Sequence, residues 1–214
     1  NEEIAFQMGQ QTAPADALMR QITQAIMESS FIRTRMFPKS LVNPRFNRYR
    51  EGGFYGKHAD SAFLGNGQQQ VRSDYSLTLF LNDPDDYEGG ELELAFASGE
   101  VMKLKEPKGT LLFYPSGVMH QVLPVERGER IAFVGWVESH IQNPQHRDVL
   151  SEITKLCDYC IFFDRIENFR LEISKNKSAK SKKSGASRRN SEKVLMYFAN
   201  NFIKISLLSG RCSG

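Results

Sequence analysis

The chain has 214 residues, of which 40% are hydrophobic and 25% are charged, and its formal net charge is +3. This composition is typical of a soluble globular domain and argues against an intrinsically disordered chain. No segment approaches the roughly 20 apolar residues that span a membrane, and the acidic, polar N-terminus lacks the features of a secretory signal. We therefore expect a cytoplasmic protein without a membrane partner.

The charge is distributed unevenly along the chain. Residues 174–214 contain ten Lys/Arg and one Glu, whereas the 173 residues before them contain eighteen Lys/Arg and twenty-four Asp/Glu. The body is thus mildly acidic, and the pI of about 8.7 is no argument that it binds nucleic acid. Residues 174–214 form a basic tail that we expect to be disordered, although its apolar end is also compatible with an amphipathic surface helix.

Residues 1–42 are predicted to be an N-terminal helical segment, with one helix over residues 14–28. Pro14 suits the first turn of a helix and Asp16 favours its N-terminal dipole. The apolar residues fall on one face at helical spacing: Leu18, Ile22, Ala25 and Ile26. Because the chain begins without Met, we expect this segment to be truncated, and one hypothesis is that the truncation leaves this form inactive.

Residues 43–140 are predicted to form an all-β core. Short runs rich in apolar, β-branched and aromatic residues alternate with Gly, Pro and Asp turns, and no helical pattern intervenes as a parallel sheet would require. This arrangement favours an antiparallel sandwich or barrel. The expected strands cover residues 44–50, 75–82, 91–96, 100–105, 110–115, 120–125 and 130–138.

Residues 141–173 return to a helical period, with an apolar stripe of Val149, Leu150, Ile153 and Leu156. Cys157 and Cys160 have the CxxC spacing of redox pairs and half zinc sites. No second such pair follows, so we favour two thiols carried by a helix.

A candidate metal site lies within the β core. His58 and Asp60 are separated by one residue, and alternate residues of a strand point to the same face. His120 follows sixty-two residues later, after a predicted strand and a turn. Two histidines and one carboxylate on one face of a metal leave its other positions open, which is the arrangement of non-heme iron(II) oxygenases. Each residue alone is more often structural, but together they favour a site.

Arg130 strengthens this interpretation, because it begins a predicted strand ten residues after His120. A dicarboxylate co-substrate that binds iron through one end needs a cation for its far carboxylate, and the planar guanidinium suits a bidentate pair. The alternative interpretation is that Arg130 is a surface charge that lies beside Glu129. His140 and His146 follow the last predicted strand, and we interpret them as surface residues.

Over residues 43–140 the chain resembles the bacterial PKHD-type hydroxylases, which are relatives of the prolyl 4-hydroxylase branch of the iron(II)/2-oxoglutarate dioxygenases. The motifs that agree in order are NRY, HxD, SLTLFLN, YEGGEL, LFYPS, the second His and RGER. After about Leu150 the resemblance ends, and the change to a Lys/Ser run suggests a foreign or out-of-frame C-terminus.

The resemblance implies a double-stranded β-helix, or jelly-roll, fold with flanking α-helices. It implies that His58, Asp60 and His120 bind Fe(II), that Arg130 binds 2-oxoglutarate, and that ascorbate keeps the iron reduced. Tyr49 matches a position where relatives often place a hydroxyl against the co-substrate, although a half-buried strand aromatic explains it equally well.

The sequence therefore predicts a 2-oxoglutarate-dependent dioxygenase that hydroxylates a peptidyl or small-molecule substrate and releases succinate and CO2. Leu77, Leu79, Phe113, Phe133 and Trp136 are expected to wall the barrel or to form its core, and the polar residues 66–70 are a candidate lid. Two alternatives remain: a non-catalytic, cupin-like jelly-roll binding module, and a nucleic-acid dealkylase that uses the basic tail. The triad sets the reaction and the loops set what enters, so the substrate is not specified.

Overall fold

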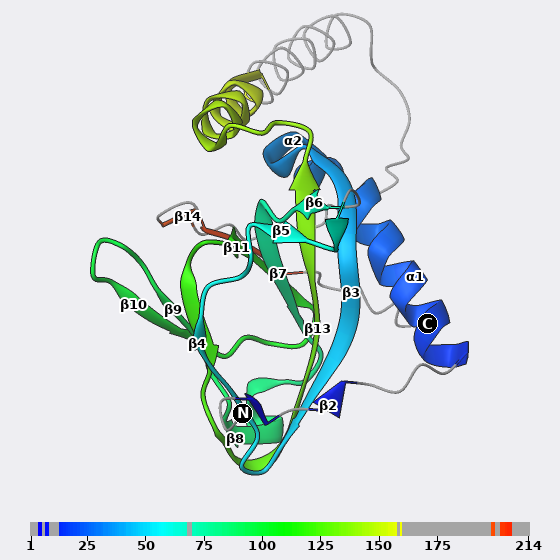
Figure 1. The fold of residues 1–214 in the computed structure, drawn as a ribbon, viewed down its shortest axis with the longest axis vertical. Coiled ribbons are helices and arrows are strands. Elements are labelled where there is room, and N and C mark those ends of the chain that lie inside the picture. The colour runs from blue at the N-terminus through cyan, green and yellow to red at the C-terminus, as the bar shows by residue number, and fades with distance from the viewer. Residues whose placement is uncertain are drawn as a thin grey trace, which may run out of the picture.

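The computed structural model describes residues 4–5, 7–8, 13–67, 70–157, 159, 198–199 and 202–206. Within these residues the architecture is a mainly β fold flanked by helices, as Figure 1 shows. No described helix is long and apolar enough to cross a membrane. Two antiparallel sheets account for most of the strands, which confirms the predicted jelly roll.

The smaller main sheet has five strands in the order β1-β4-β12-β9-β10. The larger sheet has the order β14-β15-β11-β7-β13-β3-β2, and β8 also pairs with β13. A two-stranded sheet joins β5 to β6. The strands are β1 Ile4–Ala5, β2 Gln7–Met8, β3 Pro38–Arg50, β4 Phe54–His58, β5 Phe63–Leu64, β6 Val71–Arg72, β7 Tyr75–Phe80, β8 Tyr87–Gly89, β9 Leu92–Ala95, β10 Val101–Leu104, β11 Thr110–Pro115, β12 Met119–Val122, β13 Val125–Ser139, β14 Phe198–Ala199 and β15 Phe202–Ser206.

The larger sheet buries both of its faces, so its central strands are buried along their whole length. All six residues of β7 are buried. Alternate residues of this strand join two different clusters, since successive side chains point to opposite faces. Leu77 and Leu79 pack with residues of the helices, whereas Phe80 packs with Leu92 and Leu94 of the smaller sheet. The second cluster fills the space between the two sheets, where the pocket described below also lies.

Two helices cover the outer face of the larger sheet: α1 Ala13–Glu28 and α2 Ser30–Met36. The Ser29 side chain caps α2 by accepting a hydrogen bond from the amide of Ile32 at 3.4 Å. In α1 the buried face consists of Met19, Ile22 and Ile26. The helix is confirmed, but the expected apolar face was partly wrong, because Leu18 is 46% exposed.

The boundary of the first long strand differs from the prediction. β3 begins at Pro38, inside the segment that was expected to be helical, and pairs with β13 as far as Pro38↔Ser139. Phe37 adopts a left-handed conformation with φ of 50°, which ends α2 and turns the chain into the strand. Pairing with β13 thus extends the strand six residues beyond the start that the local pattern predicted at residue 44.

The C-terminal expectations have mixed outcomes. Residues 144–157 are helical, but three residues of the predicted apolar stripe are exposed: Val149, Ile153 and Leu156. Cys157 is exposed, and Cys160 lies outside the described residues. The surface helix expected near the end of the chain was wrong where the structure describes it, because β15 pairs with β11 through Thr110↔Ser206 to Phe113↔Ile203. Most of residues 174–214 lie outside the described part.

Candidate metal centre

The two histidines are direct neighbours across the smaller sheet. His58 is the last residue of β4, His120 is the second residue of β12, and the register of these strands pairs them with each other. Their ring centroids are 4.3 Å apart. The sheet thus places two imidazoles side by side, although they are sixty-two residues apart in sequence.

Asp60 completes the cluster from outside the strand. β4 ends at His58, so the expected strand geometry for both residues was wrong at Asp60. Its amide donates instead to the carbonyl of Ser116 at 3.1 Å. The carboxylate lies 3.6 Å from Nε2 of His58 and 3.6 Å from Nε2 of His120. One ligand atom from each of the three residues lies within 4.8 Å of the others, so the group is able to hold a metal ion.

Backbone carbonyls fix the orientation of both rings. Nδ1 of His58 is 2.7 Å from the carbonyl of Gly56, and Nδ1 of His120 is 2.9 Å from that of Val118. A neutral imidazole that donates from Nδ1 presents a lone pair at Nε2, which is the tautomer a metal requires. Nε2 of His58 is buried and has no hydrogen-bond partner among the described residues.

A chain of hydroxyl groups supports the carboxylate of Asp60. Ser76 Oγ donates to Oδ2 of Asp60 at 2.5 Å, and it lies 3.0 Å from Ser116 Oγ. Ser116 Oγ in turn accepts from Ser73 Oγ at 2.7 Å. Ser76 belongs to β7, so this chain ties the metal cluster of the smaller sheet to the larger sheet. Such outer partners orient ligating carboxylates.

The electrostatics keep the carboxylate ionised. Burial alone would raise the pKa of Asp60, but interactions with His58, His120 and Ser76 bring that pKa below its usual value. For His120, burial dominates and lowers the pKa, despite the nearby carboxylate. Burial also lowers the pKa of His58, but its contacts with Asp60 and with the Gly56 carbonyl outweigh burial and raise that pKa overall.

Arg130 is not a surface charge. It is 1% exposed and lies on β13 directly opposite Tyr49 of β3. Its guanidinium carbon lies 5.1 Å from the ring centroid of Tyr49 and 5.6 Å from that of Phe80. No carboxylate pairs with its guanidinium in the described part of the chain, and the one side chain that interacts with it as a hydrogen-bond partner is the neutral phenol of Tyr87. A buried cation without a counter-charge is costly, so the site calls for an anion.

Tyr49 is equally buried, and its environment keeps it neutral. Burial raises the pKa of Tyr49, although Arg130 and a hydrogen bond from Asn47 oppose the rise. Nδ2 of Asn47 donates to the Tyr49 hydroxyl at 3.4 Å. Tyr49 is therefore not the half-buried strand aromatic that was the alternative, since it is 1% exposed and faces the pocket.

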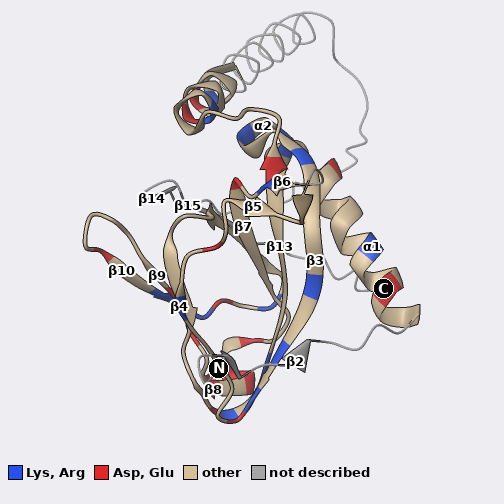
Figure 2. Cartoon of the chain, viewed as in Figure 1, with Lys and Arg blue, Asp and Glu red and all other residues tan. Residues whose placement is uncertain are grey.

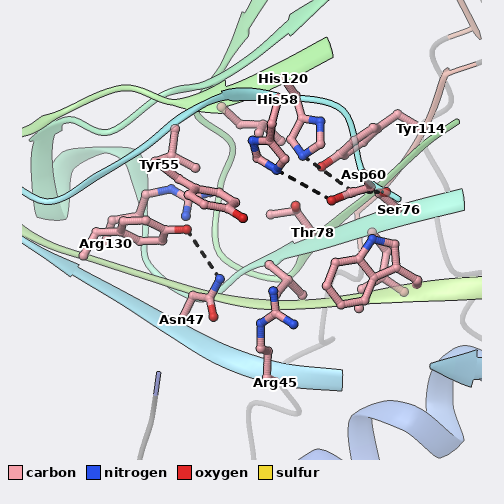
Figure 3. Close-up of a pocket in the computed structure, with 17 residues that line it drawn as sticks. Arg45, Asn47, Tyr55, His58, Asp60, Ser76, Thr78, Tyr114, His120 and Arg130 are labelled. Atoms are coloured by element: carbon pink, nitrogen blue, oxygen red, sulfur yellow. Dashed lines mark hydrogen bonds and ion pairs between the residues drawn. The ribbon is translucent and has the colours of Figure 1, made fainter. Parts of the chain in front are cut away.

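One pocket contains the metal cluster, Arg130 and Tyr49 (Figure 3). The space inside it is about 430 Å³, a figure that includes the part that opens to solvent. The sequence did not single out several of its polar lining residues: Arg45, Asn47, Tyr55, Ser76, Thr78 and Tyr114. Two of these, Arg45 and Asn47, could have been found from their alternation with Tyr49 along β3.

The expectations for the barrel wall were partly wrong. Trp136 lines the pocket. Leu77, Leu79, Phe113 and Phe133 belong to the cluster beneath the helices on the outer face of the larger sheet, although Leu77 also contributes to the pocket lining. His140 and His146 are exposed, as expected. The candidate lid at residues 66–70 lies partly outside the described residues.

The fold and site thus define a jelly-roll domain with a two-histidine, one-carboxylate centre and a buried arginine in the same pocket. Residues 44–138 match the family model of the 2OG-Fe(II) oxygenase superfamily. This part of the chain is therefore similar to the domain of the 2OG-Fe(II) oxygenases.

Individual relatives carry the same family resemblance. The chain is 42% identical over 147 residues to a PKHD-type hydroxylase of Picosynechococcus, covering 69% of this chain and 65% of that protein. It is 45% identical over 118 residues to a PKHD-type hydroxylase of Acidovorax ebreus, covering 54% and 52%. The chain thus spans 65% or less of the length of these two relatives. The crystal structure of a Pseudomonas putida prolyl-4-hydroxylase matches with 27% identity and a TM-score of 0.45, covering 66% of this chain and 76% of that one. The predicted resemblance is confirmed.

Proposed function

We propose that the protein is an Fe(II)- and 2-oxoglutarate-dependent dioxygenase that hydroxylates an unidentified peptidyl or small-molecule substrate. The observation that supports this most is the pairing of two unsatisfied groups in one pocket. Nε2 of His58 is a buried acceptor next to Asp60 and His120, and Arg130 is a buried cation without a carboxylate partner among the described residues. A metal ion satisfies the first group, and the far carboxylate of 2-oxoglutarate satisfies the second.

His58 and His120 would hold Fe(II) through Nε2, and Asp60 through its carboxylate. The donor set suits this metal, since two imidazoles and one carboxylate leave open positions for a chelating co-substrate and dioxygen. Ser76 occupies Oδ2 of Asp60 and thereby favours coordination through the other oxygen. The backbone carbonyls of Gly56 and Val118 keep both rings in the ligating tautomer.

Arg130 would bind the far carboxylate of 2-oxoglutarate with its planar guanidinium. The Tyr49 hydroxyl would donate to the same carboxylate, which requires the neutral phenol that burial favours. The rings of Tyr49 and Phe80 hold the guanidinium in place and exclude water around it. Gly90 allows the backbone to lie close to the arginine stem, because a Cβ there would meet Cδ of Arg130 at 3.3 Å.

When bound, iron and 2-oxoglutarate supply the oxidising chemistry, in which one atom of O2 enters the substrate as hydroxyl and the other enters succinate, with release of CO2. The residues of the pocket supply positioning and exclusion of water. Ascorbate, which keeps the iron ferrous between turnovers, is part of this proposal.

The test is the conversion of 2-oxoglutarate to succinate by the purified protein with Fe(II), ascorbate and air. Many dioxygenase sites turn over slowly without substrate, so isotope-labelled 2-oxoglutarate gives the necessary sensitivity. The proposal predicts succinate that depends on oxygen and is abolished in Asp60→Ala. A folded protein that binds Fe(II) and 2-oxoglutarate but forms no succinate, alone or with candidate substrates, would favour a cupin-like binding module. Product formation on alkylated nucleic acid would favour the dealkylase.

A further inference from the structure

A second arginine lines the pocket and has no part in the site described so far. Arg45 lies on β3, two residues before Asn47 and four before Tyr49, so these three side chains share one face of the strand. Figure 3 shows Arg45 and Asn47 projecting from β3 toward the side of the pocket opposite His58 and His120. β3 carries several Lys and Arg along its length (Figure 2), but of its arginines only Arg45 lines the pocket.

Arg45 has no acidic partner. Its guanidinium carbon lies 4.6 Å from the ring centroid of Trp136, another lining residue. No ion pair or hydrogen bond joins Arg45 to any described residue, and its Nε is buried and unpartnered. By contrast, Arg48 on the same strand pairs with Glu129 at 2.6 Å outside the pocket. Stacking on an indole fixes the position of the guanidinium but leaves its charge and its donors unused.

Asn47 supplies an independent, buried polar group beside Arg45. Asn47 is 4% exposed, and its Nδ2 donates to the Tyr49 hydroxyl. Its Oδ1 is buried and has no partner within the described residues. Leaving a buried carbonyl unpaired is unfavourable, so this oxygen is suited to accept a hydrogen bond from an N–H or O–H of a ligand in the pocket.

Charge balance separates Arg45 from the co-substrate site. With Fe(II) bound, the metal contributes two positive charges and Arg130 one. Asp60 contributes one negative charge and 2-oxoglutarate two. These charges cancel. The remaining ionised lining residue is Arg45, so the loaded pocket would retain one positive charge beside a flat aromatic surface.

We propose that Arg45, Asn47 and Trp136 form the subsite for the substrate that is hydroxylated, and that this substrate carries a carboxylate. The carboxylate pairs with Arg45, and an N–H or O–H within a few bonds of it donates to Oδ1 of Asn47. N-acylated amino acids and the C-terminal residues of peptides have this combination. The inference rests on the proposed function, because it concerns the substrate of the same centre.

The first step of the test measures the co-substrate alone. The protein is loaded with Mn(II), which does not turn over, and its affinity for 2-oxoglutarate is measured by calorimetry for wild type, Arg45→Gln, Arg45→Lys and the surface control Arg48→Gln. The inference predicts that the Kd values of all four proteins for 2-oxoglutarate lie within about threefold of each other. A wild type that does not bind 2-oxoglutarate contradicts the proposed function itself. A loss in Arg45→Gln alone assigns Arg45 to the co-substrate and overturns the inference.

The second step uses N-acetylated L-amino acids and, as matched controls, the same compounds with C-terminal amides. Each is added to the protein loaded with Mn(II) and 2-oxoglutarate, and proton NMR records the broadening of its acetyl signal by the paramagnetic metal. We expect the metal to broaden the acetyl signals of some of the acids and of none of the amides. Losing the charge-assisted contact in Arg45→Gln should weaken binding at least tenfold, with smaller losses in Arg45→Lys and none in Arg48→Gln.

Three results would overturn the subsite. The acetyl signals of acids and amides could be broadened equally, the acids could bind Arg45→Gln as tightly as wild type, or none of the acids could bind at all. Because Arg45 packs on Trp136, the thermal unfolding of each variant is compared with that of wild type. Arg45→Lys retains the charge and most of the stem, so it keeps the comparison informative if Arg45→Gln is less stable.

Discussion

Replacing Arg130 with Met should leave the stability of the protein unchanged or raise it, while weakening its binding of 2-oxoglutarate. Arg130 is 1% exposed, and its guanidinium pairs with no carboxylate among the described residues. Burying an ion costs several kcal/mol, and a hydrophobic residue of similar volume in place of buried charges is often neutral or stabilising by about 1–4 kcal/mol. The rings of Tyr49 and Phe80 recover part of that cost, about 2 kcal/mol for a desolvated cation–π contact. We therefore expect the free energy of unfolding of the metal-free protein to stay unchanged or to rise by up to about 2 kcal/mol in Arg130→Met.

The same change should abolish useful affinity for 2-oxoglutarate. It leaves a carboxylate in a buried pocket without its cation, a loss of about 3–5 kcal/mol. This corresponds to a rise in Kd of roughly two to three and a half orders of magnitude. Urea unfolding of the metal-free protein gives the first quantity, and calorimetric titration of the protein loaded with Zn(II) gives the second.

Arg48→Met is the matched control, because Arg48 is on the strand opposite β13 but pairs with Glu129 at the surface. A surface ion pair contributes about 0–1 kcal/mol, so this variant should lose at most that much stability and no affinity. If Arg130→Met instead loses more than about 2 kcal/mol of stability and keeps its affinity for 2-oxoglutarate, Arg130 is a structural residue and the reasoning fails.

Three further outcomes follow from the site and its scaffold. Ser76→Ala should weaken Fe(II) binding about 10- to 100-fold in a metal titration, because it removes the hydroxyl that orients Asp60; unchanged affinity would contradict that role. Gly89→Ala should cost at least about 2 kcal/mol in urea unfolding, since φ is +68° and a Cβ would meet the Pro124 carbonyl at 2.3 Å. Gly52→Ala, with φ of +77° and no atom within 4 Å, should cost only about 1–2 kcal/mol, and equal losses would count against the steric argument. Divalent metal at one hundred times its Kd should stabilise the wild type by about 2.7 kcal/mol, and a similar gain in Asp60→Ala would show that the metal binds elsewhere.

The sequence predicted the fold class and the residues of the cluster for identifiable reasons. Central strands such as β7 and β11 are rich in apolar and aromatic residues and are bounded by turn residues, so their existence was readable from local patterns. His58, Asp60 and His120 were recognisable because their types, order and spacing match a metal-binding arrangement. The direct pairing of His58 with His120 was not predictable, since the register of two distant strands depends on the whole sheet.

The parts that escaped prediction depend on tertiary contacts. Asp60 was expected in the strand, but its amide bonds to Ser116 after β4 has ended. Arg130 had been weighed as a possible surface charge, since burial is invisible to local composition. Arg45 was missed because an arginine near a strand end is usually exposed, and only the fold shows that it stacks on Trp136 inside the pocket.

The visible spectrum of the protein with Fe(II) and 2-oxoglutarate under argon tests the central claim most directly, because it needs no substrate. If His58, Asp60 and His120 hold iron beside the site of Arg130, the wild type should develop a metal-to-ligand charge-transfer band as 2-oxoglutarate chelates the iron. The band should be absent in Asp60→Ala and should require far more 2-oxoglutarate in Arg130→Met. A folded wild type without the band, or a band that persists in Asp60→Ala, would contradict the assignment of this pocket as an iron(II)/2-oxoglutarate centre.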